Sequence, residues 1–457
     1  MHVAFEVMNN RGKVLSILEL LKNRLIFLTT KYNIEEYERV DLRRKINDCW
    51  KSVYHHLGKN KQKPLDDDKF LYNHFLISFS SEIISNDEAI PTEYNSHFRK
   101  IHRAYRNDFS SYLLDEKFTL KNIDKPNFNQ HISNESSSGN GAKSLSVKDI
   151  YNYANSLQRS VESWYYLFNP IENKYILEEE RMWLDRLERI GFSDYAPLLM
   201  LIYQKESDAK KRLGLLRVIE REKFVLSLLG FYFRYAIFGP QESSALILAT
   251  EYSNETKSVE EVTEILNHRI QKLLQNEISF ENLVSEFKNG FYSWSGIRYF
   301  LFEYEQHLKS GSKTNTSKIN WVEFTQEKTD YISVEHIYPQ NSRKKCWQTD
   351  YSTYTSAQKN KLKNSLGNLL PLSKPKNSSL QDKCFIDKRD NAETTVSYRF
   401  GSYSEIEVSK EDSWTPIHIL ERGLSLLEFM EKRWRIKLGD RAGKVRLLNL
   451  GFLENNE

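Results

Sequence analysis

Residues 333–340 read SVEHIYPQ, and residues 366–377 read LGNLLPLSKPKN. The first segment places an acid, Glu335, directly before His336, and a proline follows three residues later. The second contains Gly-Asn-Leu, and Asn377 follows Asn368 by nine residues. The apolar patterns predict short strands at residues 320–325, 331–336 and 366–372, and a helix at 379–389. These elements decide the predicted fold of the C-terminal third.

The two segments together resemble the HNH (His-Me finger) nuclease motif. That motif runs from an acid-His-Ile-x-Pro segment through Gly-Asn-Leu on a second strand to a later asparagine. Residues 385–388 also match the F-x-x-K sequence that follows in one branch of the family. The resemblance implies a ββα-metal nuclease domain that hydrolyses DNA phosphodiester bonds.

The chemistry of phosphodiester cleavage explains why these residue types are wanted. A neutral imidazole titrates near physiological pH and can deprotonate water. A carboxylate and an amide oxygen are hard ligands for one Mg²⁺ or Mn²⁺, with positions left open for water and phosphate. The resemblance therefore implies that His336 activates water, that Glu335 and Asn377 hold the metal, and that Asn368 braces the histidine loop through backbone hydrogen bonds.

Two features depart from the usual motif. The first metal position is Glu335, not the commoner aspartate, and 32 residues separate His336 from Asn368. Residues 341–364 are therefore an expected insertion, irregular in structure. It contains a basic-aromatic stretch of Arg343, Lys344 and Lys345 with Trp347, which is either a DNA-tracking surface or a solvated loop.

Charge and position suggest further contacts with DNA. Between Lys309 and Phe400 there are 16 Lys and Arg against 9 Asp and Glu, a surplus of 7, although the whole chain carries only +4. A local basic surplus suits a domain that neutralises phosphates. We assign Lys376, Lys383 and Lys388 as further phosphate contacts.

The composition is that of a folded protein of several domains. The 457 residues predict two or three domains, and 39% hydrophobic with 28% charged residues is not typical of disorder. Three widely spaced cysteines without a CxxC pair argue against a disulfide framework and a cysteine zinc site. No apolar run reaches membrane-spanning length, and the start lacks a signal peptide, so we expect a bacterial cytoplasmic protein.

The pattern along the chain predicts a mainly α, multi-domain (α+β) fold. Residues 1–133 form a mostly helical N-terminal domain, 146–308 a helical domain, and 317–457 the nuclease domain with its C-terminal helix. Linkers are predicted at about 134–145 and 309–316, where the sequence is small, polar and glycine-containing. The helices expected in the middle domain are 147–167, 177–190, 197–203, 212–238, 259–275, 280–288 and 297–308. A capping box at Ser16–Glu19 predicts the start of the first helix. Thr415 as N-cap and Pro416 at the first helical position predict the start of the last helix, which runs through Trp434.

A wider resemblance covers both ends of the chain. Residues 5–23 (FEVMNNRGKVLSILELLKN) resemble the later part of the ParB/sulfiredoxin-like N-terminal domain of GmrSD-type proteins. Residues 294–305 (WSGIRYFLFEYE) and the closing helix with Trp414, Arg422 and Trp434 fit the same architecture. Such proteins join that domain to a C-terminal HNH nuclease and act in modification-dependent restriction or anti-phage defence.

The front of the chain departs from that family. Its members carry an Asp-Gly-Gln-Gln-Arg motif that is associated with nucleotide binding and hydrolysis, and this sequence has none. We expect a shortened gene product or fragment, or an upstream chain that supplies the missing part, and no nucleotide hydrolysis by this chain alone. Asn10, Arg11 and Gly12 are either the edge of a nucleotide or modified-base site or a plain strand-to-helix turn.

These observations predict a metal-dependent HNH endonuclease that cuts double-stranded DNA, modified phage DNA included. The alternative is a non-catalytic or regulatory DNA-binding remnant of such a protein. An RNA-cleaving toxin is a third reading.

Overall fold

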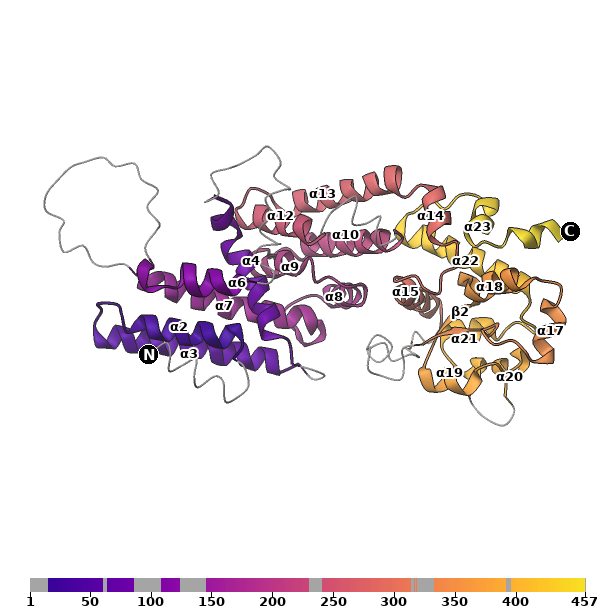
Figure 1. Cartoon of the computed structure of the whole chain (residues 1–457), viewed down its shortest axis with the longest axis horizontal. Coiled ribbons are helices and arrows are strands. Elements are labelled where there is room, and N and C mark those ends of the chain that lie inside the picture. Colours follow the sequence, from indigo (N-terminus) through magenta and orange to yellow (C-terminus); the bar gives the residue numbers. More distant parts are fainter. Residues whose placement is uncertain are drawn as a thin grey trace. The chain divides into compact units, whose positions relative to one another are not determined.

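The computed structural model describes residues 15–60, 64–85, 108–123, 145–229, 241–313, 316, 318, 333–391 and 396–456. Within these ranges the chain is mainly helical, as predicted, with two four-residue strands (Figure 1). It divides into two compact units. The N-terminal unit comprises Met1–Glu188, Phe192–Arg217 and Ile237–Glu264, and the C-terminal unit comprises Arg189–Gly191, Val218–Ala236 and Ile265–Glu457.

The N-terminal unit is built from helices. They are α2 (Ile17–Thr29), α3 (Glu36–Gly58), α4 (Asp67–Ser85), α6 (Phe109–Ser111), α7 (Val147–Phe168), α9 (Ala196–Lys205) and α12 (Gln241–Ser253), with most of α8 (Glu178–Ile190), the first part of α10 (Ala209–Ser227) and the start of α13 (Val259–Lys272). Helix α3 packs along α7, and α9 contacts α4, α7 and α12. The Ser16–Glu19 capping box predicted by the S-x-x-E pattern is present at the start of α2.

The core of the N-terminal unit encloses one histidine. His74 on α4 has no exposed surface, and its ring nitrogens lie 3.0 Å from Ser160 Oγ and 3.2 Å from Ser78 Oγ. The ring also packs against Tyr153 and Phe70. The hydroxyls satisfy both nitrogens inside an apolar core, which is what a buried neutral imidazole requires.

The C-terminal unit surrounds a small sheet with helices. Its elements are the end of α13, α14 (Phe280–Glu286), α15 (Ile297–Ser310), β1 (Ser333–His336), α17 (Lys345–Tyr351), α18 (Ser356–Asn364), the 3₁₀ turn η5 (Leu366–Asn368), β2 (Leu369–Leu372), α19 (Lys374–Leu380), α20 (Phe385–Arg389), η6 (Tyr398–Phe400), α21 (Tyr403–Val408), α22 (Pro416–Trp434), α23 (Arg441–Leu447) and η7 (Gly451–Asn456).

The sheet consists of β1 and β2, which pair antiparallel with Glu335 opposite Leu370 and His336 opposite Leu369. The predicted strand at 331–336 is observed from Ser333, and the predicted strand at 366–372 begins three residues later because η5 forms first. Helix α19 follows β2 and contacts β1. The order is therefore strand, strand, helix. The strand predicted at 320–325 lies outside the described residues.

Helix α22 is the long helix behind this sheet. It begins at Pro416 after the N-cap Thr415 and ends at Trp434, as predicted. It packs on η5, and the Arg422 guanidinium donates to the carbonyls of Gly367 and Leu369 at 2.7 and 2.9 Å. These carbonyls belong to the Gly-Asn-Leu segment, so α22 holds that segment from behind.

The expected irregular insertion is instead two short helices, α17 and α18, that belong to the core. Tyr351 of α17 stacks on Tyr338 with ring centroids 3.7 Å apart, and its hydroxyl donates to Trp414 O. Trp347 is 3% exposed and donates to the carbonyls of Asp382 and Lys383. A buried Trp347 is not available to stack on DNA. Aromatic residues spaced along α17 explain why the segment folds onto the unit.

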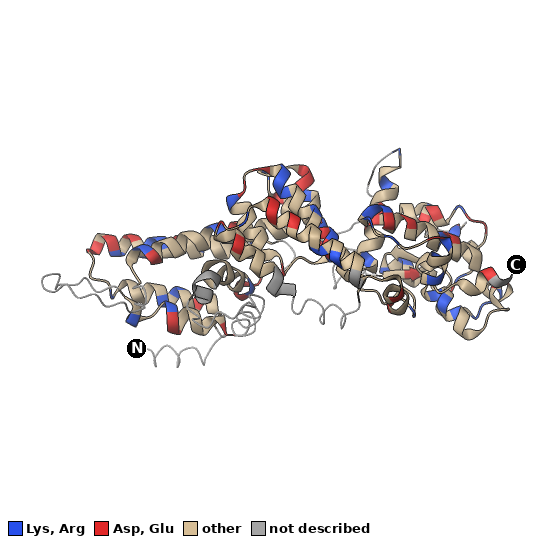
Figure 2. Ribbon diagram, turned by 90° about the horizontal axis from the view of Figure 1, so that it is seen from above, with Lys and Arg blue, Asp and Glu red and all other residues tan. Residues whose placement is uncertain are grey.

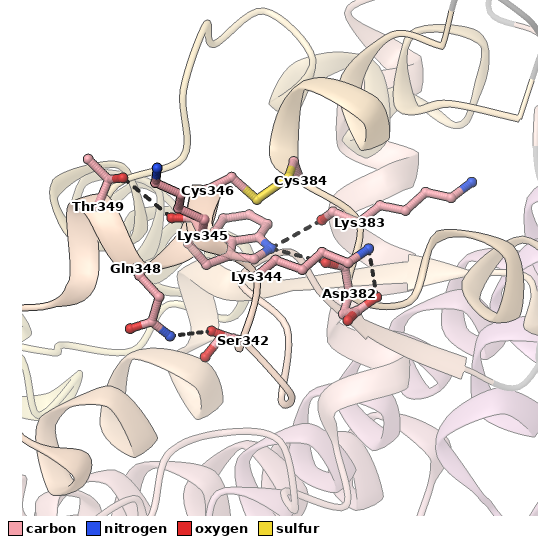
Figure 3. The surroundings of a disulfide bond; sticks show 10 residues. Ser342, Lys344, Lys345, Cys346, Gln348, Thr349, Asp382, Lys383 and Cys384 are labelled. Atoms are coloured by element: carbon pink, nitrogen blue, oxygen red, sulfur yellow. Dashed lines mark hydrogen bonds and ion pairs between the residues drawn. A yellow bond between two sulfur atoms is a disulfide. The ribbon is translucent and has the colours of Figure 1, made fainter.

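The expectation of no disulfide is wrong. Cys346 on α17 and Cys384, the N-cap of α20, are joined by a disulfide across 38 residues (Figure 3). An ion pair between Lys344 and Asp382 lies beside it at 3.1 Å. Spacing along the sequence did not show that these cysteines meet, because folding brings them together.

The predicted helix at 379–389 is also corrected. Two helices, α19 and α20, take its place, and Gln381 between them has a φ of 37° that no helix continues through. In contrast, the helices expected between residues 147 and 308 are observed at α7, α8, α9, α13, α14 and α15. The helix expected at 212–238 is observed as α10, which ends at Ser227, and residues 230–238 lie outside the described residues. Helix α12 was not predicted. The domain boundaries remain predictions, since residues 146–308 contribute to both compact units.

No helix in the described part of the chain combines the length and the apolar character that a membrane crossing needs.

Candidate functional site

His336 is the last residue of β1 and is 6% exposed. Its ring lies against Tyr292, with ring centroids 4.3 Å apart, and its Nε2 lies 3.4 Å from the side-chain amide nitrogen of Gln340. The side chain of Asn364, at the end of α18, forms a hydrogen bond with the imidazole. Residues from β1, α18 and the segment before α15 therefore meet at this ring.

Tyr292 and Asn364 were not predicted as site residues. Tyr292 is held in place because the backbone N–H of Phe291 donates to Asn364 O at 2.8 Å. Gly290, which directly precedes Phe291, has a φ of 88°, and a Cβ on Gly290 would approach Asn364 O to 2.5 Å. The sequence signal was the turn at residues 290–294 that leads into the helix at 297–308. Nothing in that signal indicated a contact with His336.

Lys363 is a further residue near His336 that the sequence did not indicate. Its ammonium donates to Gln340 O at 2.7 Å and lies 5.5 Å from the centre of the Tyr338 ring. Burial and the neighbouring Lys359 lower the pKa of Lys363. It is half-buried and brings a positive charge to the side of the imidazole.

The pKa of His336 is lowered to about 4, mainly by burial. The hydrogen bond with Asn364 opposes this shift, and the charges of Lys388 and Lys363 contribute to it. The imidazole is therefore neutral at physiological pH. A neutral imidazole can accept a proton from water, which is the role predicted for this residue.

Glu335 points to the other face of β1, since successive residues of a strand alternate. It is 3% exposed. Lys388 Nζ lies 2.6 Å from its Oε1, and the Tyr398 hydroxyl donates to the same oxygen at 3.2 Å. Burial raises the pKa of Glu335 and lowers the pKa of Lys388, while each charge opposes the shift of the other. The carboxylate is thus occupied by side chains of α20 and η6.

Lys388 is corrected as a phosphate contact. It has no exposed surface, and its ammonium donates to Glu335 and to the carbonyls of His336 and Ile337. Phosphate cannot reach it in this arrangement. The sequence showed its charge but not the partner 53 residues away.

Asn368 is fully buried and uses all of its hydrogen-bonding capacity. Its Oδ1 accepts from Tyr338 N at 2.7 Å and from Trp414 Nε1 at 3.1 Å. Its Nδ2 donates to the carbonyls of Tyr338 and Lys363, both at 2.9 Å. The two bonds to Tyr338 are backbone hydrogen bonds to the loop after His336, of the kind predicted for this residue. Its effect on catalysis stays a prediction.

The predicted residues on α19 have different surroundings. Asn377 is half-buried and accepts no hydrogen bond at its side chain within the part of the chain that is described. Lys376 forms an ion pair with Glu405 and donates to Ser397 O at 2.8 Å. Its assignment as a phosphate contact stays a prediction, and the Glu405 carboxylate holds the ammonium in this structure.

The remaining basic candidates are accessible. Arg343, Lys344 and Lys345 are exposed around the start of α17, although Lys344 pairs with Asp382. Figure 3 shows the Lys383 side chain extending away from the disulfide. Lys and Arg alternate with acidic residues along the helices (Figure 2). Asn10, Arg11 and Gly12 lie outside the described residues.

The predicted metal ligands do not fit a metal in this arrangement. Lys388 and Tyr398 take the Glu335 carboxylate, and among the described residues no three His, Cys, Asp or Glu side chains gather to hold an ion. Of the two predicted ligands, Glu335 already shares its Oε1 with Lys388 and Tyr398.

One family of known proteins matches part of the chain. Residues 275–429 match the family model of GmrSD restriction endonucleases, C-terminal domain. The matched region includes α14, α15, both strands and most of α22, and therefore every residue around His336. It supports a C-terminal region of the restriction-endonuclease type, for which DNA is the substrate. No curated protein and no solved structure matches the chain.

Proposed function

We propose that the C-terminal unit is an HNH endonuclease of ββα type that hydrolyses DNA phosphodiester bonds. The observation that carries the proposal is a neutral His336 at the end of the first strand, inside the region that matches the restriction-endonuclease family. The strand–strand–helix order of β1, β2 and α19 supports it. Double-stranded DNA, modified phage DNA included, is the proposed substrate.

In the proposed reaction His336 accepts a proton from water as the resulting hydroxide attacks phosphorus. The bond to the 3′ oxygen then breaks, and that oxygen gains a proton. Asn368 keeps the loop after His336 in place, and Tyr292 packs against the imidazole and limits its rotation. The requirement for one divalent metal is part of the proposal, and its ligands are not assigned.

The test is cleavage of plain and modified phage DNA by the full chain with Mg²⁺, with Mn²⁺ and with chelator. We expect cleavage by the wild type and a loss of about 10²–10⁴-fold in His336→Ala, the size of a lost general base. His268→Ala is the matched control, since His268 is an exposed histidine on α13, away from the site. Unchanged cleavage by His336→Ala would contradict the proposed role.

A second candidate is a DNA-binding module that does not cut. The occupied carboxylate of Glu335 favours it, because the predicted metal position is taken. DNA binding by the wild type without cleavage under any of these conditions would support the module. RNA is offered beside DNA in the same experiment. Cleavage of the RNA and not of the DNA would support the RNA-cleaving alternative.

A further inference from the structure

The ammonium of Lys388 is completely satisfied without any ligand. It has three N–H donors. One meets Glu335 Oε1 at 2.6 Å, and the others meet the carbonyls of His336 and Ile337, each at 3.2 Å. Neither charged side chain is exposed by more than 4%. The contact therefore joins α20 to the end of β1.

Lys388 also contacts the backbone that carries the imidazole of His336. The two accepted carbonyls belong to the consecutive residues His336 and Ile337, and Ile337 N donates to Asn368 O at 3.0 Å. Lys388 and the backbone of Asn368 thus fix the backbone that directly follows His336. The side chain of His336 leaves this backbone on the face opposite to Glu335.

Removing one member of a buried ion pair is costly, because the other charge stays behind without a partner. A metal ion bound at Oε1 of Glu335 would have to displace Lys388 and leave an ammonium and two carbonyls unpaired in a closed core. The Tyr398 hydroxyl would lose its acceptor as well. The arrangement disfavours a metal at Glu335 for this reason.

We propose that Glu335 and Lys388 form a structural ion pair that positions His336, and that Glu335 is not a metal ligand. The positioning part rests on the proposed nuclease function, whereas the ion-pair part does not. Lys388 is a positioning residue that acts on His336 through its backbone.

The first experiment measures Mn²⁺ binding to the full chain by calorimetry, for the wild type, Glu335→Gln and Lys388→Met. We expect dissociation constants within about twofold of each other, or no binding in any of the three. A metal ligand would behave otherwise, because even residues beside a ligand change metal affinity by about 10–100-fold. Weakening of that size in Glu335→Gln, or tighter binding in Lys388→Met, would overturn the proposal.

The second experiment measures thermal unfolding of the two single variants and of Glu335→Gln/Lys388→Met. Each single change is expected to lower the melting temperature, and the double variant should melt above Lys388→Met, since no unpaired charge remains. Additive losses would overturn the ion-pair role. Glu335→Gln keeps the shape of the side chain, so the comparison survives if Lys388→Met alone fails to fold.

The third experiment concerns positioning. Below its melting temperature, Lys388→Met should lower kcat with little change in KM, and the double variant should recover part of kcat. Lys444→Met is the matched control, because Lys444 pairs with Glu431 at 2.8 Å on helices away from His336. Equal kcat values for Lys388→Met and Lys444→Met would overturn the proposal that Lys388 positions His336. A wild type that cuts nothing would end the nuclease proposal, while the first two experiments would still decide the ion pair.

Discussion

Gly367 lies against the backbone of α22, where a side chain has no room. A Cβ on Gly367 would lie 1.9 Å from Ile419 O and 2.7 Å from Gly423 N. Both atoms belong to the backbone of α22, so neither can rotate away. The glycine of the Gly-Asn-Leu segment is therefore explained by this close approach and not by an unusual backbone angle.

Gly367→Ala is expected to destabilise the C-terminal unit by about 3 kcal/mol, because helix and turn must separate to admit the methyl group. Denaturant unfolding measures the change. Gly311→Ala is the control, since its nearest neighbour is Leu308 O at 3.6 Å, and it should stay within about 1 kcal/mol of the wild type. Equal stability of the two variants would contradict the close packing.

Two neighbours of His336 show what a sequence can reveal about single residues. The Gly-Asn-Leu motif pointed to Asn368 and to its backbone contacts, and the buried side chain makes them. The same reading assigned Lys388 to phosphate. Its charge was visible in the sequence, but its burial against Glu335 depends on a tertiary contact that no local pattern encodes.

Elements with strong end signals were predicted closely. The Thr415-Pro416 start of α22 and the Ser16 capping box of α2 lie where the sequence placed them, because capping residues satisfy the free backbone groups of a helix end. Helices α17 and α18 were missed. They have seven and nine residues, too short to show a clear periodicity. Trp347 and Tyr351 pack α17 onto the unit, and Leu362 packs α18.

The disulfide is expected to stabilise the arrangement of α17 and α20. A cross-link across 38 residues contributes about 4 kcal/mol in the chain-entropy description. Reductant should therefore lower the melting temperature of the wild type. Cys346→Ser/Cys384→Ser should melt at the reduced temperature with or without reductant. A wild type whose unfolding ignores reductant would contradict the pairing.

At the scale of the molecule, each unit buries a histidine whose pKa is lowered by burial, to about 3 for His74 and about 4 for His336. Such a group binds its proton in the unfolded chain near pH 6.5, so stability is lost as the pH falls below that value. The C-terminal unit also contains carboxyls whose pKa values burial raises, with the opposite effect. They are Glu220, Glu305, Glu335 and Glu405.

We therefore expect acid to destabilise the N-terminal unit more than the C-terminal unit. Between pH 7 and pH 5 the loss from His74 is about 2 kcal/mol. Hydrogen exchange followed by peptide analysis measures each unit separately. His74→Gln keeps polar atoms near Ser160 and Ser78. It should reduce the dependence of stability on pH in the N-terminal unit alone. Equal acid sensitivity of both units in the wild type would contradict this account.

The helical class of the described residues followed from the periodicity of the sequence, and the matched family region supports a domain of the restriction-endonuclease type at residues 275–429. The division of the helices between the two compact units did not follow from that periodicity. Residues 146–308 read as one continuous helical stretch, yet α9 packs with α4 and α7, whereas α15 packs with α21 and α22. Such grouping depends on which apolar faces meet, and amphipathic patterns do not name their partners.

The Cys346–Cys384 bond closes a covalent ring around the residues between them, which include α18, β2, α19 and Asn368, while His336 lies outside it. A protease that cuts once inside this ring leaves a molecule whose two pieces remain attached. On a denaturing gel such a nicked chain runs as one species until a thiol is added, and then separates into two.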